Sequence, residues 1–211
     1  MMDPWWRIQA YLSLSQLLQQ PDNELLEYIN GTELQEIWEQ VNATYDLQLP
    51  ETWVRTGLPN LEDFNRLWNL TMGPITPLAE PIESLYKIWT TDPSCENLIA
   101  TQKGYLKSDW GCHMETLLTK VGFQLPPQFS HCPDHLILEL EFFSLLIEKG
   151  SVEAQLKFAE HHFDWLEDLV QIAKEKEVPQ IYQDLYNLCM HYVKTDIASL
   201  KSEMLSKENI P

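Results

Sequence analysis

Apolar residues recur at intervals of three and four along almost the whole of this 211-residue chain. The segments 34–45 and 136–147 show the pattern most clearly. This spacing gives a helix one apolar face, whereas a strand would need apolar residues at alternate positions. There are no alternating runs joined by hairpin turns, and there is no repeat of constant length. The chain is therefore predicted to be all-α, a single compact helical domain of about eight or nine helices over residues 1–211.

Capping residues set the expected helix boundaries in the first half of the chain. A short helix is predicted at about residues 23–29, and Thr32 followed by Gln35 indicates a capping box at the start of the next helix. Another helix is expected from Leu61 to Met72. The three prolines between residues 74 and 81 predict a rigid, extended connector after it.

The second half of the chain contains clearer boundaries. A strong helix is expected to begin at Pro133–Asp134 and to end at Gly150. Ser151 is a typical N-cap for the following helix, which is predicted to bend near Asp164. Pro179 then separates this helix from a last one.

The charge balance excludes some classes of partner. Fourteen Lys and Arg residues against thirty-two Asp and Glu residues give a formal net charge of −18. Such a surface repels phosphate backbones and anionic membranes, so neither nucleic acid binding nor stable membrane insertion is expected. It would attract a basic peptide. The alternative is that the acidity only keeps the protein soluble.

The cysteines indicate a reducing compartment. Cys95, Cys112, Cys132 and Cys189 are scattered, with no Cys-x-x-Cys pair and no disulfide framework. No stretch approaches the roughly twenty apolar residues that span a bilayer, and the N-terminus has no signal-peptide pattern. A cytoplasmic location with reduced thiols is expected.

Catalytic and metal-binding templates do not match the chain. It has no Gly-rich phosphate loop, no His-Glu-x-x-His and no Gly-x-Ser-x-Gly. Cys112, His113, His131, Cys132 and His135 are residue types that bind zinc, but their spacing fits no standard site. Both cysteines are expected to be small buried apolar residues. No catalytic residue, metal or cofactor is predicted, and the protein is not expected to be an enzyme.

Three sequence blocks carry the functional signal. They are Gly73-Pro74 with Pro81–Tyr86, then Pro133–Leu140, and then His161–Trp165. In this order and at these separations they resemble the TorD/DmsD-like family of redox-enzyme maturation chaperones. The resemblance extends over about residues 61–193. Relative to the family pattern, one residue is missing between Pro133 and Asp134, and Thr71 replaces a frequent aromatic residue.

The resemblance implies that these blocks border a groove for a twin-arginine leader peptide. The implied leader-binding residues are Leu67, Leu70, Thr71, Gly73, Pro74, Glu83, Ser84, Tyr86, Asp134, His135, Glu139, His161 and Trp165.

Structural roles are also open for several of these residues. Asp134 has the position of an N-cap for its own helix. His135 and Glu139 are four residues apart and could pair on one helix face. Tyr86 is expected to pack in the core, and Trp165 could pack against His161.

The resemblance implies a cytoplasmic chaperone without catalytic activity. Its partner would be the leader and apo form of a molybdopterin oxidoreductase catalytic subunit, whose cofactor insertion it would assist and whose premature export it would prevent. Monomer–dimer exchange is a further expectation, since helical proteins with long connectors can swap segments. One alternative is a regulatory or scaffold protein that binds another amphipathic helix. Another is a metal- or haem-linked enzyme that uses Cys112, His113, His131 and His135.

Overall fold

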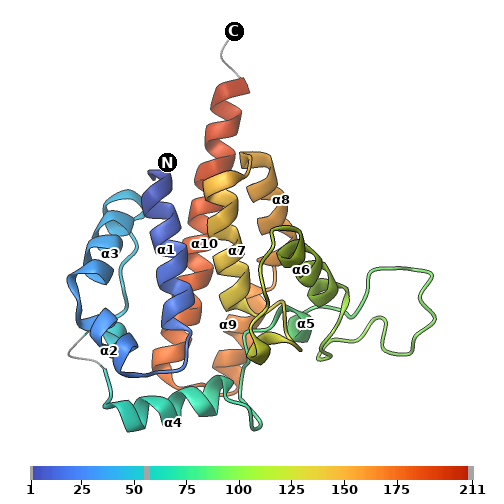
Figure 1. Cartoon of the computed structure of the whole chain (residues 1–211), viewed down its shortest axis with the longest axis horizontal. Coiled ribbons are helices and arrows are strands. Elements are labelled where there is room, and N and C mark those ends of the chain that lie inside the picture. Colours follow the sequence, from blue (N-terminus) through green and yellow to red (C-terminus); the bar gives the residue numbers. More distant parts are fainter. Residues whose placement is uncertain (1, 55–57, 209–211) are drawn as a thin grey trace.

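The computed structural model describes residues 2–54 and 58–208, and within them the chain forms ten α-helices and two short 3-10 helices (Figure 1). The first five α-helices are α1 (Pro4–Leu17), α2 (Asn23–Asn30), α3 (Thr32–Tyr45), α4 (Leu61–Met72) and the single turn α5 (Glu83–Tyr86). The others are α6 (Asp109–Lys120), α7 (Leu136–Lys149), α8 (Val152–His162), α9 (Leu166–Glu175) and α10 (Gln180–Glu208). The 3-10 helices are η1 (Glu51–Trp53) and η2 (Pro127–Phe129). The prediction of an all-α, single compact helical domain is confirmed.

Helices α1, α7 and α10 form the centre of the molecule. Figure 1 shows α2 and α3 on one side of them, α5, α6 and α8 on the other, and α4 across one end. Helix α7 packs along α1, and its residues 136–140 are all buried. A helix that is apolar on nearly every side is typical of a core position. None of the helices in the described residues is both long and apolar enough to cross a bilayer.

A buried ion pair joins the two ends of the chain. Arg7 on α1 donates from Nε to Oδ1 of Asp196 on α10 at 2.7 Å and from Nη2 to Oδ2 at 2.8 Å. The hydroxyls of Tyr11 and Tyr45 also donate to this carboxylate, at 3.0 and 2.8 Å. Both charged side chains are almost completely inaccessible to water. This bidentate pair fixes α1, α3 and α10 relative to one another.

One expected helix and one expected helix cap differ from the structure in this part of the fold. The helix predicted to bend near Asp164 is instead two helices, α8 and α9. Trp165 Nε1 donates to the carbonyl of His162 at 2.7 Å, which satisfies one of the free acceptors at the end of α8. The capping box at Thr32 is also absent, because Thr32 is the first residue of α3 and the N-cap is Gly31. The Ser151 cap is confirmed, since its Oγ accepts from Ala154 N at 3.1 Å.

The connector after α4 folds back along the end of that helix. Leu78 N donates to Leu70 O at 2.9 Å, and Ala79 N donates to Thr71 O at 3.0 Å. Gly73 makes this turn possible, but not through left-handed backbone geometry, since its φ is −73°. A Cβ at Gly73 would lie 2.6 Å from Asn69 Cα and O. The glycine is required by close approach.

Candidate functional site

Backbone hydrogen bonds join the end of the connector to the start of α7. Leu136 N donates to Pro81 O at 2.8 Å, and Glu83 N donates to Asp134 O at 3.0 Å. Between these two bonds, Ile82 and His135 form an isolated antiparallel bridge. The first and second sequence blocks, about fifty residues apart in the chain, therefore lie side by side.

A cleft of about 550 Å³ opens where these two blocks meet. Its walls come from the turn after α1, the last part of α4, the connector, η2 and the start of α7. The lining residues are Gln19, Gln20, Trp68, Asn69, Met72, Pro74, Glu80, Ile82, Gln128, Phe129, Cys132, His135 and Ile137. We call this the α4–α7 cleft.

The charge of the α4–α7 cleft is negative. Glu80 is its one charged side chain, and neither Lys nor Arg is among the described residues that line it. Burial raises the pKa of the Glu80 carboxyl. Apolar side chains such as Trp68, Met72 and Ile137 share the walls with uncharged polar side chains, four of which are Gln or Asn. Together with a single acidic group, this lining favours a ligand that has an apolar part and carries positive charge at one end.

A second cleft of about 540 Å³ lies on the other side of the connector. Leu78, Leu85, Tyr86 and Ile172 supply apolar surface there, but Lys103, Lys176 and Asp168 also line it. This mixed charge is a poorer match for a cationic apolar peptide. Glu80 lines both clefts, so the connector is a thin wall between them.

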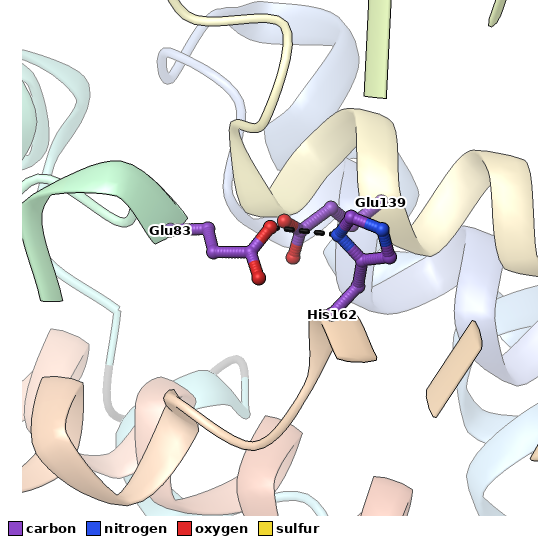
Figure 2. A group of neighbouring side chains, drawn as sticks. All are labelled: Glu83, Glu139 and His162. Atoms are coloured by element: carbon purple, nitrogen blue, oxygen red, sulfur yellow. Dashed lines mark hydrogen bonds and ion pairs between the residues drawn. The ribbon is translucent and has the colours of Figure 1, made fainter. Parts of the chain in front are cut away.

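A buried polar cluster lies behind the junction of α5 and α7 (Figure 2). Glu83 Oε2 is 2.7 Å from His162 Nδ1, and Glu83 Oε1 accepts from Lys87 Nζ at 3.1 Å. Glu139 faces Glu83 from α7, and Glu83, Glu139 and His162 are all inaccessible to water. Burial raises the pKa of the Glu139 carboxyl well above its ordinary value, and the nearby Glu83 and Asp134 raise it further.

The structure places the predicted site residues of α4 in different environments. Pro74 lines the α4–α7 cleft. Leu67 is half-buried against the core, while Leu70 is 48% exposed and outside the residues that line the cleft. Thr71 is buried, and its hydroxyl donates to Leu67 O at 2.8 Å.

Asp134 does not cap its own helix. Helix α7 begins at Leu136 rather than at Pro133–Asp134, and its N-cap is His135, whose Nδ1 accepts from Ile137 N at 3.2 Å. Asp134 instead reaches across to α5, where Oδ2 accepts from Ser84 N at 2.8 Å and from the Ser84 hydroxyl. Burial raises the pKa of Asp134, and the bonds from Ser84 partly offset this.

The expected pairing of His135 with Glu139 is also absent from the described residues. The side-chain oxygens of Glu139 have no hydrogen-bond partner, while His135 packs against Phe129 with ring centroids 5.1 Å apart. His135 lines the α4–α7 cleft. Burial lowers the pKa of its imidazole, which favours the neutral form.

The third sequence block contributes a different histidine from the one predicted. His161 is exposed, and its backbone carbonyl accepts from Lys87 Nζ at 2.9 Å, whereas His162 enters the buried cluster. Trp165 stacks on Tyr86 with ring centroids 5.2 Å apart rather than on His161. The expectation that Tyr86 packs in the core is confirmed.

Several residues of the site were missed by sequence reasoning. Lys87 in the cluster, and Trp68 and Phe129 in the cleft, belong to no motif. His162 lies within the third block, but the motif pointed to its neighbour His161. The four-residue spacing from Glu83 to Lys87 was an available signal for an ion pair. The cleft walls are formed by segments that are distant in the sequence, so no local pattern identifies them.

No cluster of potential metal ligands in the described residues contains any of the residues of zinc-binding type considered above, which are Cys112, His113, His131, Cys132 and His135. The one cluster of potential metal ligands in the described residues is Glu83, Glu139 and His162. Cys112 is exposed and Cys132 is half-buried, so the expectation that both are buried is wrong. The four cysteines are free thiols.

The structure is an all-helical domain with an open cleft that contains one carboxylate. A protein-family model described as the nitrate reductase delta subunit matches residues 16–175. The chain belongs to this family of molybdoenzyme assembly chaperones, and the resemblance that the motifs indicated is confirmed. Proteins of this family bind molybdoenzyme subunits and are chaperones rather than catalysts. No individually curated protein matches the chain.

Proposed function

We propose that the α4–α7 cleft binds the twin-arginine leader of a molybdopterin oxidoreductase catalytic subunit. The observation that carries this proposal is the meeting of the first two sequence blocks around one cleft. A leader has paired arginines followed by an apolar run, and the cleft offers apolar walls with one carboxylate. Burying the apolar run would contribute about 25 cal/mol per Å².

The whole surface supports capture of a cationic segment. A net charge of −18 attracts the arginines at long range and raises the rate of encounter. Ordering a flexible leader reduces the net affinity, so the complex is reversible. Such a complex holds the apoprotein in the cytoplasm while the molybdenum cofactor is inserted, and then releases it for export.

The predicted contact residues take two roles in this proposal. Pro74 and His135 line the cleft and contact the leader, and the exposed Leu70 and His161 lie outside its walls. The fully buried Glu83, Ser84, Asp134 and Glu139 position α5 against α7 and thereby shape the cleft. They act as positioning residues.

Calorimetric titration with a synthetic leader tests the proposal. Gln128 is exposed on η2 and lines the cleft, so Gln128→Lys adds a cation where the leader would bind. We expect a loss of affinity of about tenfold, since like charges oppose each other there. Gln124→Lys is the matched control: it changes the net charge equally, at an exposed position of the same loop outside the cleft.

The peptide controls separate leader recognition from general helix binding. A leader with both arginines replaced by glutamine, and a shuffled leader, should bind at least about tenfold more weakly. Equal binding of the natural and shuffled peptides would contradict the proposal. It would favour a scaffold that accepts any amphipathic segment.

A further inference from the structure

The buried cluster behind the cleft has more negative groups than its contacts neutralise. Glu83, Glu139 and Asp134 are all completely inaccessible to water. Lys87 is 11% exposed and donates to Glu83 Oε1, but it also pairs with Asp164 Oδ1 at 2.7 Å. Buried carboxylates need a paired cation, a proton or a metal ion, because an isolated buried charge costs several kcal/mol.

Glu139 is the group that indicates a ligand. Neither of its carboxylate oxygens has a hydrogen-bond partner among the described residues. The carboxyl points at Glu83 and the ring of His162, as Figure 2 shows. One ligand atom from each of Glu83, Glu139 and His162 lies within 4.8 Å of the others. Ligands at about 2.1 Å from a tetrahedral metal ion are about 3.4 Å apart, so small side-chain rotations would close the set around an ion.

The surroundings of His162 fit a metal ligand. Its Nδ1 faces the carboxylates, and its Nε2 is 2.8 Å from His113 Nδ1. The hydrogen bond between Nδ1 and Glu83 Oε2 holds a proton, which a metal ion would displace. With Nε2–H donating to His113, Nδ1 would then offer its lone pair to the metal. A second group that fixes the tautomer in this way is usual for metal-bound histidines.

A pocket lies on the His113 side of the cluster. A pocket of about 250 Å³ is lined by His162 and His113 and also by the exposed Lys157 and His161. It leads from the surface to the imidazole of His162. Neither Glu83 nor Glu139 lines this pocket, so a local movement of side chains would be needed for an ion to reach all three ligands.

We propose that Glu83, Glu139 and His162 bind one divalent first-row transition-metal ion, with His113 as the partner that orients His162. Two carboxylates and one imidazole suit Mn²⁺, Fe²⁺, Co²⁺ or Zn²⁺. The absence of a thiolate from this ligand set makes a soft ion such as Cu⁺ a poor match. The three ligands come from α5, α7 and α8, so the ion would stabilise the wall of the leader-binding cleft. The proposal does not depend on which peptide the cleft binds.

The test uses the full-length chain without a histidine tag, first stripped with EDTA and then titrated with Co²⁺. We expect one equivalent to bind, with visible d–d bands, no thiolate charge-transfer band and a higher melting temperature. Glu139→Gln keeps the shape of the side chain and should weaken Co²⁺ binding by at least about 100-fold, while His113→Phe should weaken it about 10-fold or more.

Two variants serve as matched controls. His161→Ala removes the exposed neighbouring histidine, and Cys112→Ser removes the exposed thiol, so both should bind Co²⁺ as the wild type does. Absence of d–d bands and of any change in melting temperature in the folded wild type would overturn the proposal. Unchanged Co²⁺ binding by Glu139→Gln would overturn it equally, and a shared proton between Glu83 and Glu139 would then neutralise the cluster.

Discussion

At the scale of single residues, the buried carboxyls are the side chains whose environment departs most from the ordinary. Glu139 is completely buried and faces another carboxyl, so the pKa of its own carboxyl is raised well above the ordinary value. Asp134 is buried too, but it receives two hydrogen bonds from Ser84. Two buried carboxyl groups therefore have different roles here, and contacts from α5 determine which.

The pH dependence of stability tests the state of Glu139 when metal is removed by EDTA. The pKa of the Glu139 carboxyl in the native state is raised above its ordinary value of 4.5. Between these two pKa values the native state therefore binds more protons than the unfolded state. Stability should therefore fall as the pH rises from about 4.5 towards the native pKa. Glu139→Gln has no carboxyl to ionise, so its free energy of unfolding should not fall in this pH range. Relative to wild type, it should gain up to about 1.4 kcal/mol of unfolding free energy per pH unit.

Urea unfolding at a series of pH values measures this difference. The control is Glu148→Gln, an exposed glutamate on the same helix, which should follow the wild-type profile at every pH. If the unfolding free energy of Glu139→Gln changed with pH as that of the wild type does, Glu139 would be shown to ionise normally.

Residue roles were the least predictable feature of the sequence. The Asp134 motif was correctly recognised, but its local position suggested an N-cap. Its actual partner, Ser84, lies fifty residues away. A hydrogen bond between distant segments depends on how helices pack, which local spacing does not encode.

At the scale of helices, several boundaries followed from local signals in the sequence, although the start of α7 did not. Helix α4 has the predicted bounds, and Ser151 caps α8 as predicted. The break between α8 and α9 was not predicted as a full interruption, because Trp165 ends α8 through a tertiary arrangement that includes Tyr86. The pairing of Arg7 with Asp196 could not be predicted either, since 189 residues separate them.

The Arg7–Asp196 pair gives a prediction at this scale. Asp196→Asn leaves the Arg7 charge buried without an anion, and we expect a loss of about 3–5 kcal/mol in unfolding free energy. Replacing both residues together, as Arg7→Met with Asp196→Leu, should cost much less than the single change. Urea denaturation of the two variants measures both values, and a single variant as stable as wild type would contradict this role.

At the scale of the whole molecule, fold class and family were predictable but the cleft was not. Helical periodicity predicted the fold class, and three motifs in the right order predicted the family, whose model matches residues 16–175. The cleft depends on contacts between α4, the connector, η2 and α7, and so required the structure. It also distinguishes the residues that line the site from those that only support it.

Photo-crosslinking is the measurement that tests leader binding in the α4–α7 cleft most directly. A leader peptide carrying a benzophenone within its apolar run is irradiated in complex with the protein, and the attachment sites are located by mass spectrometry. We expect cross-links at Trp68, Met72 or Ile137, with loss of labelling when unlabelled leader is added. Labelling confined to Leu85 and Ile172, in the second cleft, would contradict our assignment of the leader-binding site.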